Sequence, residues 1–415
     1  MISKIILENF FSFGEPTTIE LNPDINILVG INGSGKSNFL KAIRLLKESI
    51  AGEGFEKIFL KDWSGFNSVC NFSKESKNDK KDYIKITYEF NKDSINSVID
   101  NREFFYYENP VYEITIMRSG ETGYYLKEKI SEQRINNHEP SLVYLDMENS
   151  KGFITTRLKD IVKFGDPTEI SFKSTETILR QISDPDRYYQ LFTLKRAIEN
   201  IAVYDYFDTT LKSSIRQAAT FGTEKYLLSD GQNLMSILNW IKNQHSLEYE
   251  IIEEHIKNIN PLFKDINFAS IGSKLLLVLR EHSLSKSISI EHISDGTLRY
   301  LILLAILCNP ERGNMVCIDE PEIGLHPDMI NSISKLMKTA SKTSPFLESS
   351  TQLIIATHSP LLLNLFDLDE VLIFEKDLNN QTTVTTKSED DFKDWGDNFL
   401  VGQLWLKGEL GGKRW

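Results

Sequence analysis

Residues 30–37 read GINGSGKS, a combination of glycines, a lysine and a serine that suits phosphate binding. The segment follows an apolar run at 25–29 and precedes a stretch of helical character at 38–47. Glycines let several backbone N–H groups point into one cavity, and the helix that follows adds its positive N-terminal end. The spacing G-x-x-x-x-G-K-[ST] therefore predicts a P-loop, which holds the phosphates of a nucleoside triphosphate.

The side chains of this loop are expected to divide the work. Lys36 reaches the outer phosphates, and Ser37 offers its hydroxyl to Mg²⁺. The residues predicted to surround the nucleotide are Asn32, Gly33, Ser34, Gly35, Lys36, Ser37 and Asn38.

Residues 315–320 read MVCIDE, an apolar run that ends in two adjacent carboxylates. This is the arrangement expected of a Walker B strand whose tip faces the P-loop. Asp319 would then hold Mg²⁺, directly or through water, and Glu320 would polarise the attacking water as the general base. The presence of the P-loop favours this interpretation over a pair of surface acids.

Two further segments gain meaning from their order along the chain. Residues 293–299 read ISDGTLR and open an apolar helix, for which Ser294 alone would be a plain N-cap. Ahead of the acid pair, the segment resembles the signature loop of ABC-type ATPases, which meets the γ-phosphate held by a second subunit. The residues of this loop are Ser294, Asp295, Gly296 and Thr297.

A histidine marks the second segment. His358 follows the apolar run at 352–356 and resembles the switch histidine that senses the γ-phosphate.

Alternating strand-like and helix-like segments must position these residues. Near the start we expect strands at 4–8, 17–21 and 25–29, and a helix from the P-loop to about residue 49. The C-terminal part predicts helices at 298–307, 327–340 and 360–366, and strands at 315–318, 352–356 and 371–374. Such alternation favours a parallel sheet, in which the first and last segments of the chain meet.

The middle of the chain has a different pattern. Period-two segments predict an antiparallel lobe with strands at 83–90, 111–117, 124–130 and 142–145. Helical spacing follows at 175–200, 211–220, 233–242 and 249–258, with a break at Asp184-Pro185-Asp186. A hairpin around Gly272 and a strand at 287–292 complete the region, and no heptad repeat predicts a coiled coil.

Composition gives the class of protein. The chain has 415 residues, 40% of them hydrophobic, and a formal net charge of −12. We expect a cytoplasmic globular protein with no membrane segment, because the apolar run at 300–308 is too short to cross a bilayer and no signal peptide is evident. The three cysteines lack metal-site spacing. The charge gives no support to nucleic-acid binding, although a local basic groove can coexist with a negative total.

The motifs together resemble the ATPase head of the SMC, RecF and OLD branch of ABC ATPases. The resemblance rests on IILENF at 5–10, NGSGKSN at 32–38, DEPE at 319–322 and GLHP at 324–327. It implies an α/β fold, an ABC-type P-loop NTPase head with a mixed sheet plus inserted antiparallel-β and helical segments. The expected parts are the head's N-terminal portion at 1–50, a β-rich portion at 51–172, a helical insertion at 173–262 and the head's C-terminal portion at 263–415.

The same resemblance implies ATP and Mg²⁺ as cofactors and a homodimer or higher oligomer closed by ATP. Residues 175–208 and the tail at 405–415 are similar to standalone bacterial AAA/ABC ATPases that are often encoded beside an effector in phage-defence loci. A separately encoded effector is thus an expected partner.

Two departures limit what carries over. Phe11 stands where many relatives have Arg or Lys, so a basic contact to the nucleotide from the turn at 9–14 is not expected; this turn is either a hydrophobic plug or a wall beside the nucleotide. Fewer than about 60 residues follow His358, too few for the Toprim nuclease domain of OLD proteins. Any nuclease is therefore expected in another chain, and the acids at 389–391 are expected to be solvated.

Three functions remain open on the sequence. The leading one is an ATPase that controls a separate effector in anti-phage defence. The alternatives are a RecF- or SMC-like repair ATPase that clamps DNA directly, and a regulatory scaffold that binds ATP with little turnover. A transporter subunit is disfavoured because roughly 250 residues of β-rich and helical insertion separate the P-loop from the signature loop.

Overall fold

The computed structural model describes residues 1–71, 82–97, 105–133, 141–157, 160–165, 172–220, 222–272, 274–342, 350–395 and 400–411. Contacts divide the chain into two compact units. The first unit comprises Met1–Pro23, Gly30–Ile201 and Leu372–Thr386, and the second comprises Asp24–Val29, Ala202–Val371 and Lys387–Trp415. The four-part division expected from the sequence stays a prediction.

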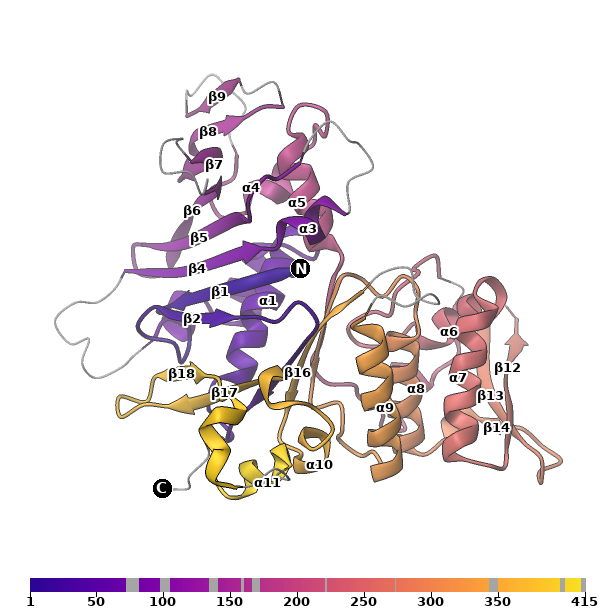
Figure 1. The fold of residues 1–415 in the computed structure, drawn as a ribbon. Helices are drawn as coiled ribbons and strands as arrows, with labels where there is room; N and C mark the ends of the chain where they lie inside the picture. The colour runs from indigo at the N-terminus through magenta and orange to yellow at the C-terminus, as the bar shows by residue number, and fades with distance from the viewer. Residues whose placement is uncertain are drawn as a thin grey trace. The chain divides into compact units, whose positions relative to one another are not determined.

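The first unit is built on an eight-stranded sheet in the order β2-β1-β4-β5-β6-β7-β8-β9, in which all neighbours are antiparallel (Figure 1). Buried and partly exposed residues alternate along β5, as expected of a sheet that packs on one face. The strands are β1 (Ile2–Glu8), β2 (Thr17–Glu20), β4 (Tyr83–Phe90), β5 (Pro110–Ser119), β6 (Gly123–Glu132), β7 (Leu142–Glu148), β8 (Lys151–Thr155) and β9 (Ile161–Phe164).

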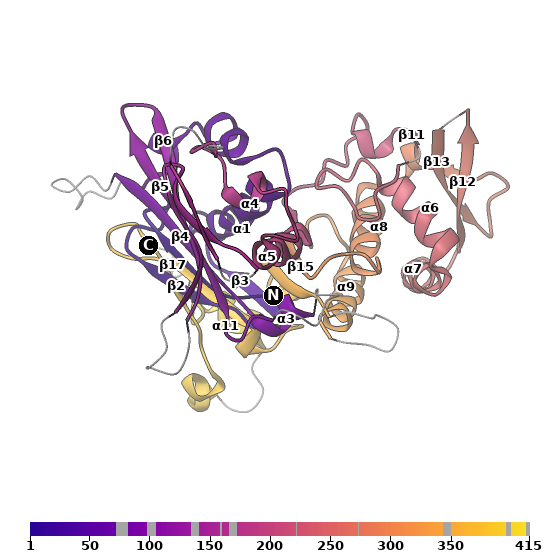
Figure 2. The same ribbon diagram turned by 90° about the horizontal axis from the view of Figure 1, so that it is seen from above.

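Helices cover one face of this sheet, as Figure 2 shows for α1 (Lys36–Ile50), α4 (Ile178–Gln181) and α5 (Tyr189–Glu199). Helix α1 buries an apolar stripe of Phe39, Leu40, Ile43 and Leu46. It is also tied to the sheet by a hydrogen bond, because the buried Tyr88 hydroxyl donates to the Ala42 carbonyl at 2.6 Å. The unit also contains α2 (Phe66–Val69), α3 (Lys92–Asn96), a π-helical turn (Lys57–Asp62), and a hairpin of β17 (Val371–Lys376) and β18 (Thr382–Thr385).

The second unit holds the parallel strands. Strand β16 (Gln352–Thr357) lies between β15 (Met315–Asp319) and β3 (Ile25–Val29), and β10 (Ile201–Tyr204) lies beyond β15. Every residue of β3 and β16 is buried, as is usual for a parallel sheet covered on both faces. The register pairs Asp319 with Ala356 and Thr357 with Val29, so these three strands end at the same edge.

Helices α8 (Asp295–Leu307) and α9 (Pro327–Ala340) pack together in this unit, and α8 is buried along most of its length. A smaller sheet of β11 (Ala219–Thr220), β12 (Phe263–Ile271), β13 (Lys274–Glu281) and β14 (Ile288–Ser289) pairs in the order β11-β13-β12, with β14 on β13. Helices α6 (Leu234–Gln244) and α7 (Ser246–Ile259) accompany it, and α10 (Pro360–Leu363) packs against α11 (Val401–Leu406).

Most of the expected elements are confirmed, including the antiparallel lobe, the hairpin around Gly272 and the break at Asp184-Pro185-Asp186. The helix expected at 211–220 is wrong: the segment forms a short 3₁₀ turn, Ser214–Arg216, and then β11. The physical reason is partly local and partly tertiary, because the Ser213 hydroxyl caps this turn and the Arg216 side chain bonds to carbonyls far along the chain.

The strand expected at 287–292 is also mostly wrong. Only Ile288–Ser289 is extended, and Ile290–His292 turns into a 3₁₀ helix. The Ile290 carbonyl accepts a hydrogen bond from Arg216 instead of from a strand. Strands β8, β9 and β18 and helix α11 were not predicted from the sequence. Among the described residues, no helix is long and apolar enough to span a membrane.

Candidate functional site

The P-loop lies in the first unit, at the N-terminus of α1. Gly33 and Gly35 have φ angles of 80° and 115°, a backbone conformation that glycine adopts far more readily than other residues. A Cβ on Gly35 would lie 2.3 Å from Thr382 Oγ1, and one on Gly30 would lie 2.4 Å from the Phe374 carbonyl. The loop therefore needs glycine at Gly35 for both its backbone shape and its close packing.

The polar groups of the loop fit a bound phosphate. Gly35 is the N-cap of α1 and provides no side-chain hydrogen bond to the first turn of the helix. Ser34 is fully buried, and within the described chain its hydroxyl has no hydrogen-bond partner. Lys36 is 5% exposed, and its ammonium donates to the Gly30 carbonyl at 2.8 Å. A triphosphate oxygen is a chemically suitable partner for each of these groups.

Two side chains outside the motif support the loop. Thr382 Oγ1, on β18, lies 2.7 Å from the Ser34 carbonyl and 2.7 Å from Ser12 Oγ. Asn38, predicted as a nucleotide ligand, donates to Ser12 Oγ at 2.9 Å. The sequence reasoning missed Thr382 because β18 itself was not predicted, and only the tertiary fold brings it under the loop.

The aromatic turn at 9–14 is a plug for two of its three phenylalanines, since Phe10 and Phe13 are fully buried. Phe11 is half-buried and has a φ of 47°. The Lys41 ammonium, on α1, lies 4.4 Å from the centre of the Phe11 ring. A cation therefore accompanies this turn although Phe11 replaces the basic residue of many relatives.

In the second unit, the structure brings Glu320 and His358 together. They follow β15 and β16, whose ends are in register, and His358 Nε2 lies 3.5 Å from Glu320 Oε1. Glu320 has a φ of 49°, an unusual value for a non-glycine residue, and its N–H donates to the Ala356 carbonyl at 2.8 Å. The backbone is thus held in a strained conformation at the residue predicted to be the general base.

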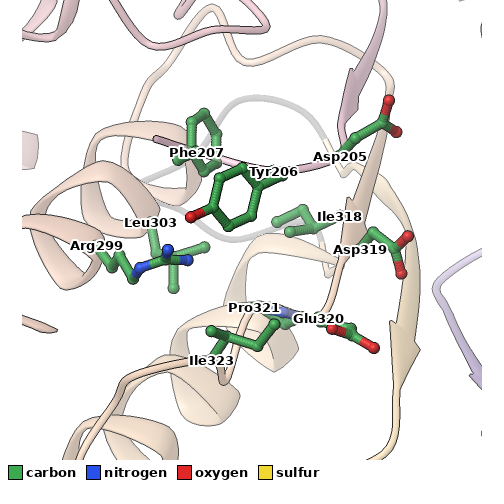
Figure 3. Close-up of a pocket in the computed structure, with 10 residues that line it drawn as sticks. All are labelled: Asp205, Tyr206, Phe207, Arg299, Leu303, Ile318, Asp319, Glu320, Pro321 and Ile323. Carbon is green, nitrogen blue, oxygen red and sulfur yellow. The ribbon is translucent and has the colours of Figure 1, made fainter. Parts of the chain in front are cut away.

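Asp319 and Glu320 also border a pocket of about 150 Å³ within the second unit (Figure 3). In the figure their carboxylates point to the same side, away from the ring of Tyr206. The Arg299 guanidinium of α8 lies 5.0 Å from the centre of that ring. The segment after β10 that supplies Tyr206 was not predicted to lie near the acids, since no local motif marks it.

The predicted signature loop forms the start of α8. The Ser294 hydroxyl accepts from the Thr297 N–H at 3.2 Å and lies 2.8 Å from the Thr297 hydroxyl, so Ser294 is indeed an N-cap. A Cβ on Gly296 would lie 2.7 Å from the Gly324 carbonyl. Glycine is required here because the loop that follows the acids approaches so closely.

Arg216 anchors this loop, and the sequence reasoning missed it. Its side chain is 2% exposed and donates to the carbonyls of Ile290 and Ile293, each at 2.7 Å. The same guanidinium lies 2.6 Å from Asp295 Oδ1, although the Asp295 side chain is 66% exposed. The charge of Asp295 thus draws the first turn of α8 onto a buried cation. The wrong prediction of a helix at 211–220 hid this arginine.

The metal-binding capacity of the described side chains is limited. Within the described ranges, no group of three or more His, Cys, Asp and Glu residues could hold a metal ion. Mg²⁺ usually binds one or two protein groups, several waters and the phosphates of its substrate. The predicted protein ligands are Ser37 in the first unit and Asp319 in the second.

Compared with known protein families, residues 25–364 match the family described as "AAA domain, putative AbiEii toxin, Type IV TA system". Among curated proteins, a Plasmodium falciparum structural maintenance of chromosomes protein 3 homolog is 24% identical over 275 residues, which are 65% of this chain and 19% of that protein. The Old nuclease of Escherichia phage P2 is 27% identical over 195 residues, 41% of this chain and 30% of that protein. This chain thus spans less than a third of either relative.

Two solved structures have a similar fold. One is an SMC head bound to the C-terminal winged-helix domain of ScpA, with a TM-score of 0.55, 13% identity, and coverage of 94% of this chain and 99% of that one. The other is the Smc head from Pyrococcus furiosus with an extended coiled coil, bound to the C-terminal domain of ScpA. Its TM-score is 0.53 at 12% identity, covering 95% of this chain and 98% of that one. The family match covers most of the chain, so this protein belongs to the AAA-domain family just named, and its fold is similar to that of SMC heads.

Proposed function

We propose that this protein binds Mg-ATP between two copies of the chain and hydrolyses it. The observation that carries the proposal is the pairing of Glu320 with His358 at strand ends in register, on a sheet that includes the strand leading into the P-loop. Lys36, Ser37 and the loop amides would hold the phosphates, and Asp319 would face the metal.

The reaction proposed is in-line transfer of the γ-phosphoryl group to water. Glu320 would orient the water and accept its proton, and His358 would contact the γ-phosphate from its place beside Glu320. Mg²⁺, when bound, supplies charge neutralisation at the phosphate oxygens. Lys36 and the N-terminus of α1 would stabilise the charge that develops in the transition state.

The second copy would contribute the signature loop, through the Ser294 hydroxyl, the Gly296 backbone and the N-terminus of α8. The support for this role is that the loop is pre-organised. Asp295 is already paired with Arg216, and Ser294 already caps α8. ATP binding would close the pair and hydrolysis would reopen it. The assembly would be a homodimer or a higher homo-oligomer.

The biological role proposed is control of a separately encoded effector in bacterial anti-phage defence. The family name refers to a putative toxin of a toxin–antitoxin system, and one relative is a phage-encoded nuclease. Both SMC heads of similar fold are bound to a partner protein. These names support an ATPase that acts through another chain, and the location proposed for it is the cytoplasm.

A second candidate function is a RecF- or SMC-like repair ATPase that clamps DNA directly. The similarity to the structural maintenance of chromosomes protein 3 homolog supports it. ATP-dependent DNA binding that weakens steeply with salt would favour this alternative. A scaffold that binds ATP without useful turnover is the third candidate, and it predicts slow phosphate release that Glu320→Gln leaves unchanged.

The test uses the full chain and the Glu320→Gln variant. Wild type should release phosphate from Mg-ATP, and chelation of Mg²⁺ should stop the release. Glu320→Gln should bind ATP with wild-type affinity, hydrolyse it about 100-fold more slowly and accumulate as a dimer by light scattering. A variant that stays monomeric with saturating Mg-ATP contradicts the paired arrangement, and equal rates for both proteins contradict the role of Glu320.

A further inference from the structure

Glu322, two residues beyond the proposed general base, turns its carboxyl group toward the end of β16. Its Oε1 accepts a hydrogen bond from the Thr357 hydroxyl and a second, at 3.3 Å, from the His358 N–H. Thr357 is fully buried, and its hydroxyl oxygen also accepts the Ser359 N–H at 3.0 Å. One carboxylate oxygen therefore organises the backbone on both sides of His358.

The position is a costly one for an acid. Glu322 Oε2 is buried, and the part of the chain that the structure describes offers it no hydrogen-bond partner. Burial raises the pKa of the Glu322 carboxyl above its usual value, because the charged form is poorly solvated there. An apolar side chain would avoid this cost but would remove the acceptor of the Thr357 hydroxyl and the His358 N–H, so the carboxyl group is kept at this position together with those two donors.

The contacts of Glu322 complete a ring of interactions that joins Glu320, His358 and Glu322. The Glu320 side chain lies against the His358 imidazole, the His358 N–H bonds to Glu322, and two peptide units lead from Glu322 back to Glu320. The strained Glu320 backbone is tied to the same strand through the Ala356 carbonyl. The loop after β15 thus makes four contacts with residues 356–358, two through Glu320 and two through Glu322.

We propose that Glu322 is a positioning residue, which holds the His358 loop so that the imidazole stays against the Glu320 carboxylate. It acts through His358 and Thr357. The inference rests on the proposed hydrolysis for its kinetic consequence, but its structural consequence can be measured without nucleotide.

The structural test is hydrogen exchange of the 357–359 amides in the full chain without ATP. Glu322→Ala removes the acceptor of the His358 N–H and of the Thr357 hydroxyl, whose oxygen accepts the Ser359 N–H, so the His358 and Ser359 amides should exchange at least about tenfold faster than in wild type. Glu322→Gln keeps a carbonyl oxygen at the same place and should stay within about twofold of wild type. Glu370→Ala is the matched control, because it removes another half-buried carboxylate that accepts a backbone N–H, from Asp367 at 2.8 Å in the same unit.

The kinetic test is a double-mutant cycle with His358→Ala. Glu322→Ala should lower the single-turnover hydrolysis rate by about 10- to 100-fold and leave ATP affinity unchanged. Adding it to His358→Ala should cost little more, since both changes remove the same interaction. Full additivity, or a Glu322→Gln variant as impaired as Glu322→Ala, would overturn the proposal.

The two tests separate the two hypotheses. If wild type hydrolyses no ATP, the proposed function fails, and the exchange experiment still decides whether Glu322 holds the His358 loop. Unchanged exchange in Glu322→Ala overturns the positioning role even in an active enzyme. Faster exchange throughout the second unit would also overturn it, because the residue would then serve only global stability.

Discussion

The P-loop of the first unit and the acid–histidine edge of the second are built in different ways. The P-loop owes its shape to glycines with positive φ and to backbone approaches that leave no space for a Cβ. The acid–histidine edge, formed by Glu320, Glu322 and His358 at the ends of β15 and β16, owes its shape to side chains that are far apart in the sequence. Glu322, for example, is bonded to Thr357 and His358. Backbone shape can be encoded in eight consecutive residues, whereas a side-chain network needs the tertiary fold.

In the P-loop, Lys36→Ala is expected to weaken ATP binding more than any other substitution considered. Removing the ammonium takes away the positive charge aimed at the outer phosphates while the glycine backbone stays intact. ATP binding should weaken by more than about 100-fold, measured by titration with a fluorescent ATP analogue. Thermal unfolding should stay close to that of wild type, and tight ATP binding by the variant would contradict the role of Lys36.

Gly35→Ala compared with Gly33→Ala tests how far the P-loop depends on close packing. Both glycines have positive φ, but a Cβ on Gly35 would lie 2.3 Å from Thr382 Oγ1, whereas one on Gly33 would meet no atom within 4 Å. Each variant bears the backbone strain, of about 1 kcal/mol. ATP affinity should fall by about tenfold or more in Gly35→Ala and clearly less in Gly33→Ala, and equal losses would show that φ alone matters.

Asp295→Asn tests the side-chain network of the second unit. Loss of the charge weakens the contact to the buried Arg216 without opening a cavity, so the start of α8 should become less ordered. We expect the ATPase rate at saturating ATP to fall by about threefold to tenfold while affinity for ATP changes little, because the loop would act on the nucleotide of the second copy. Ser213→Ala, which removes a hydroxyl that caps the Arg216 turn, is a control for local disorder.

The last expected effect is on stability and not on activity, and it concerns a buried acid in the first unit. Burial raises the pKa of Glu128 to about 7, although Tyr112 and the Ile178 N–H both donate to it. Because the folded pKa is raised, the folded state binds more protons than the unfolded state between about pH 4.5 and 7, and stability falls as pH rises through this range. Glu128→Gln should remove that slope and raise the free energy of unfolding at pH 8 by about 1–3 kcal/mol.

The matched control for this prediction is Glu132→Gln. Glu132 is fully buried as well, but its carboxylate accepts two backbone N–H groups at 2.7 Å and the Tyr144 hydroxyl at 2.6 Å. Glu132→Gln should therefore lower the free energy of unfolding at pH 8, whereas Glu128→Gln should raise it. Denaturant unfolding at pH 5.5 and pH 8 measures both, and the same sign for the two variants would contradict the argument.

How much the sequence predicted follows the same contrast. Strands β3, β4, β15 and β16 and the P-loop were predicted nearly to the residue, because each is marked by a continuous pattern. Motif order predicted roles for Glu320 and His358 at the same γ-phosphate, but their contact with each other was not predicted. Arg216, Glu322 and Thr382 received no role, since a single Arg, Glu or Thr has no local signature and its function depends on residues far along the chain.

The way the chain threads through the two units has a practical consequence for the gene. Neither unit is encoded by one continuous stretch, and the first is assembled from three. A fragment that stops at Ile201 would lack the hairpin whose Thr382 supports the Ser34 carbonyl, and one that starts at Ala202 would lack the central strand beside β16. Truncation series and two-fragment expression would therefore disrupt both halves at once, so point substitutions in the intact gene are the informative route.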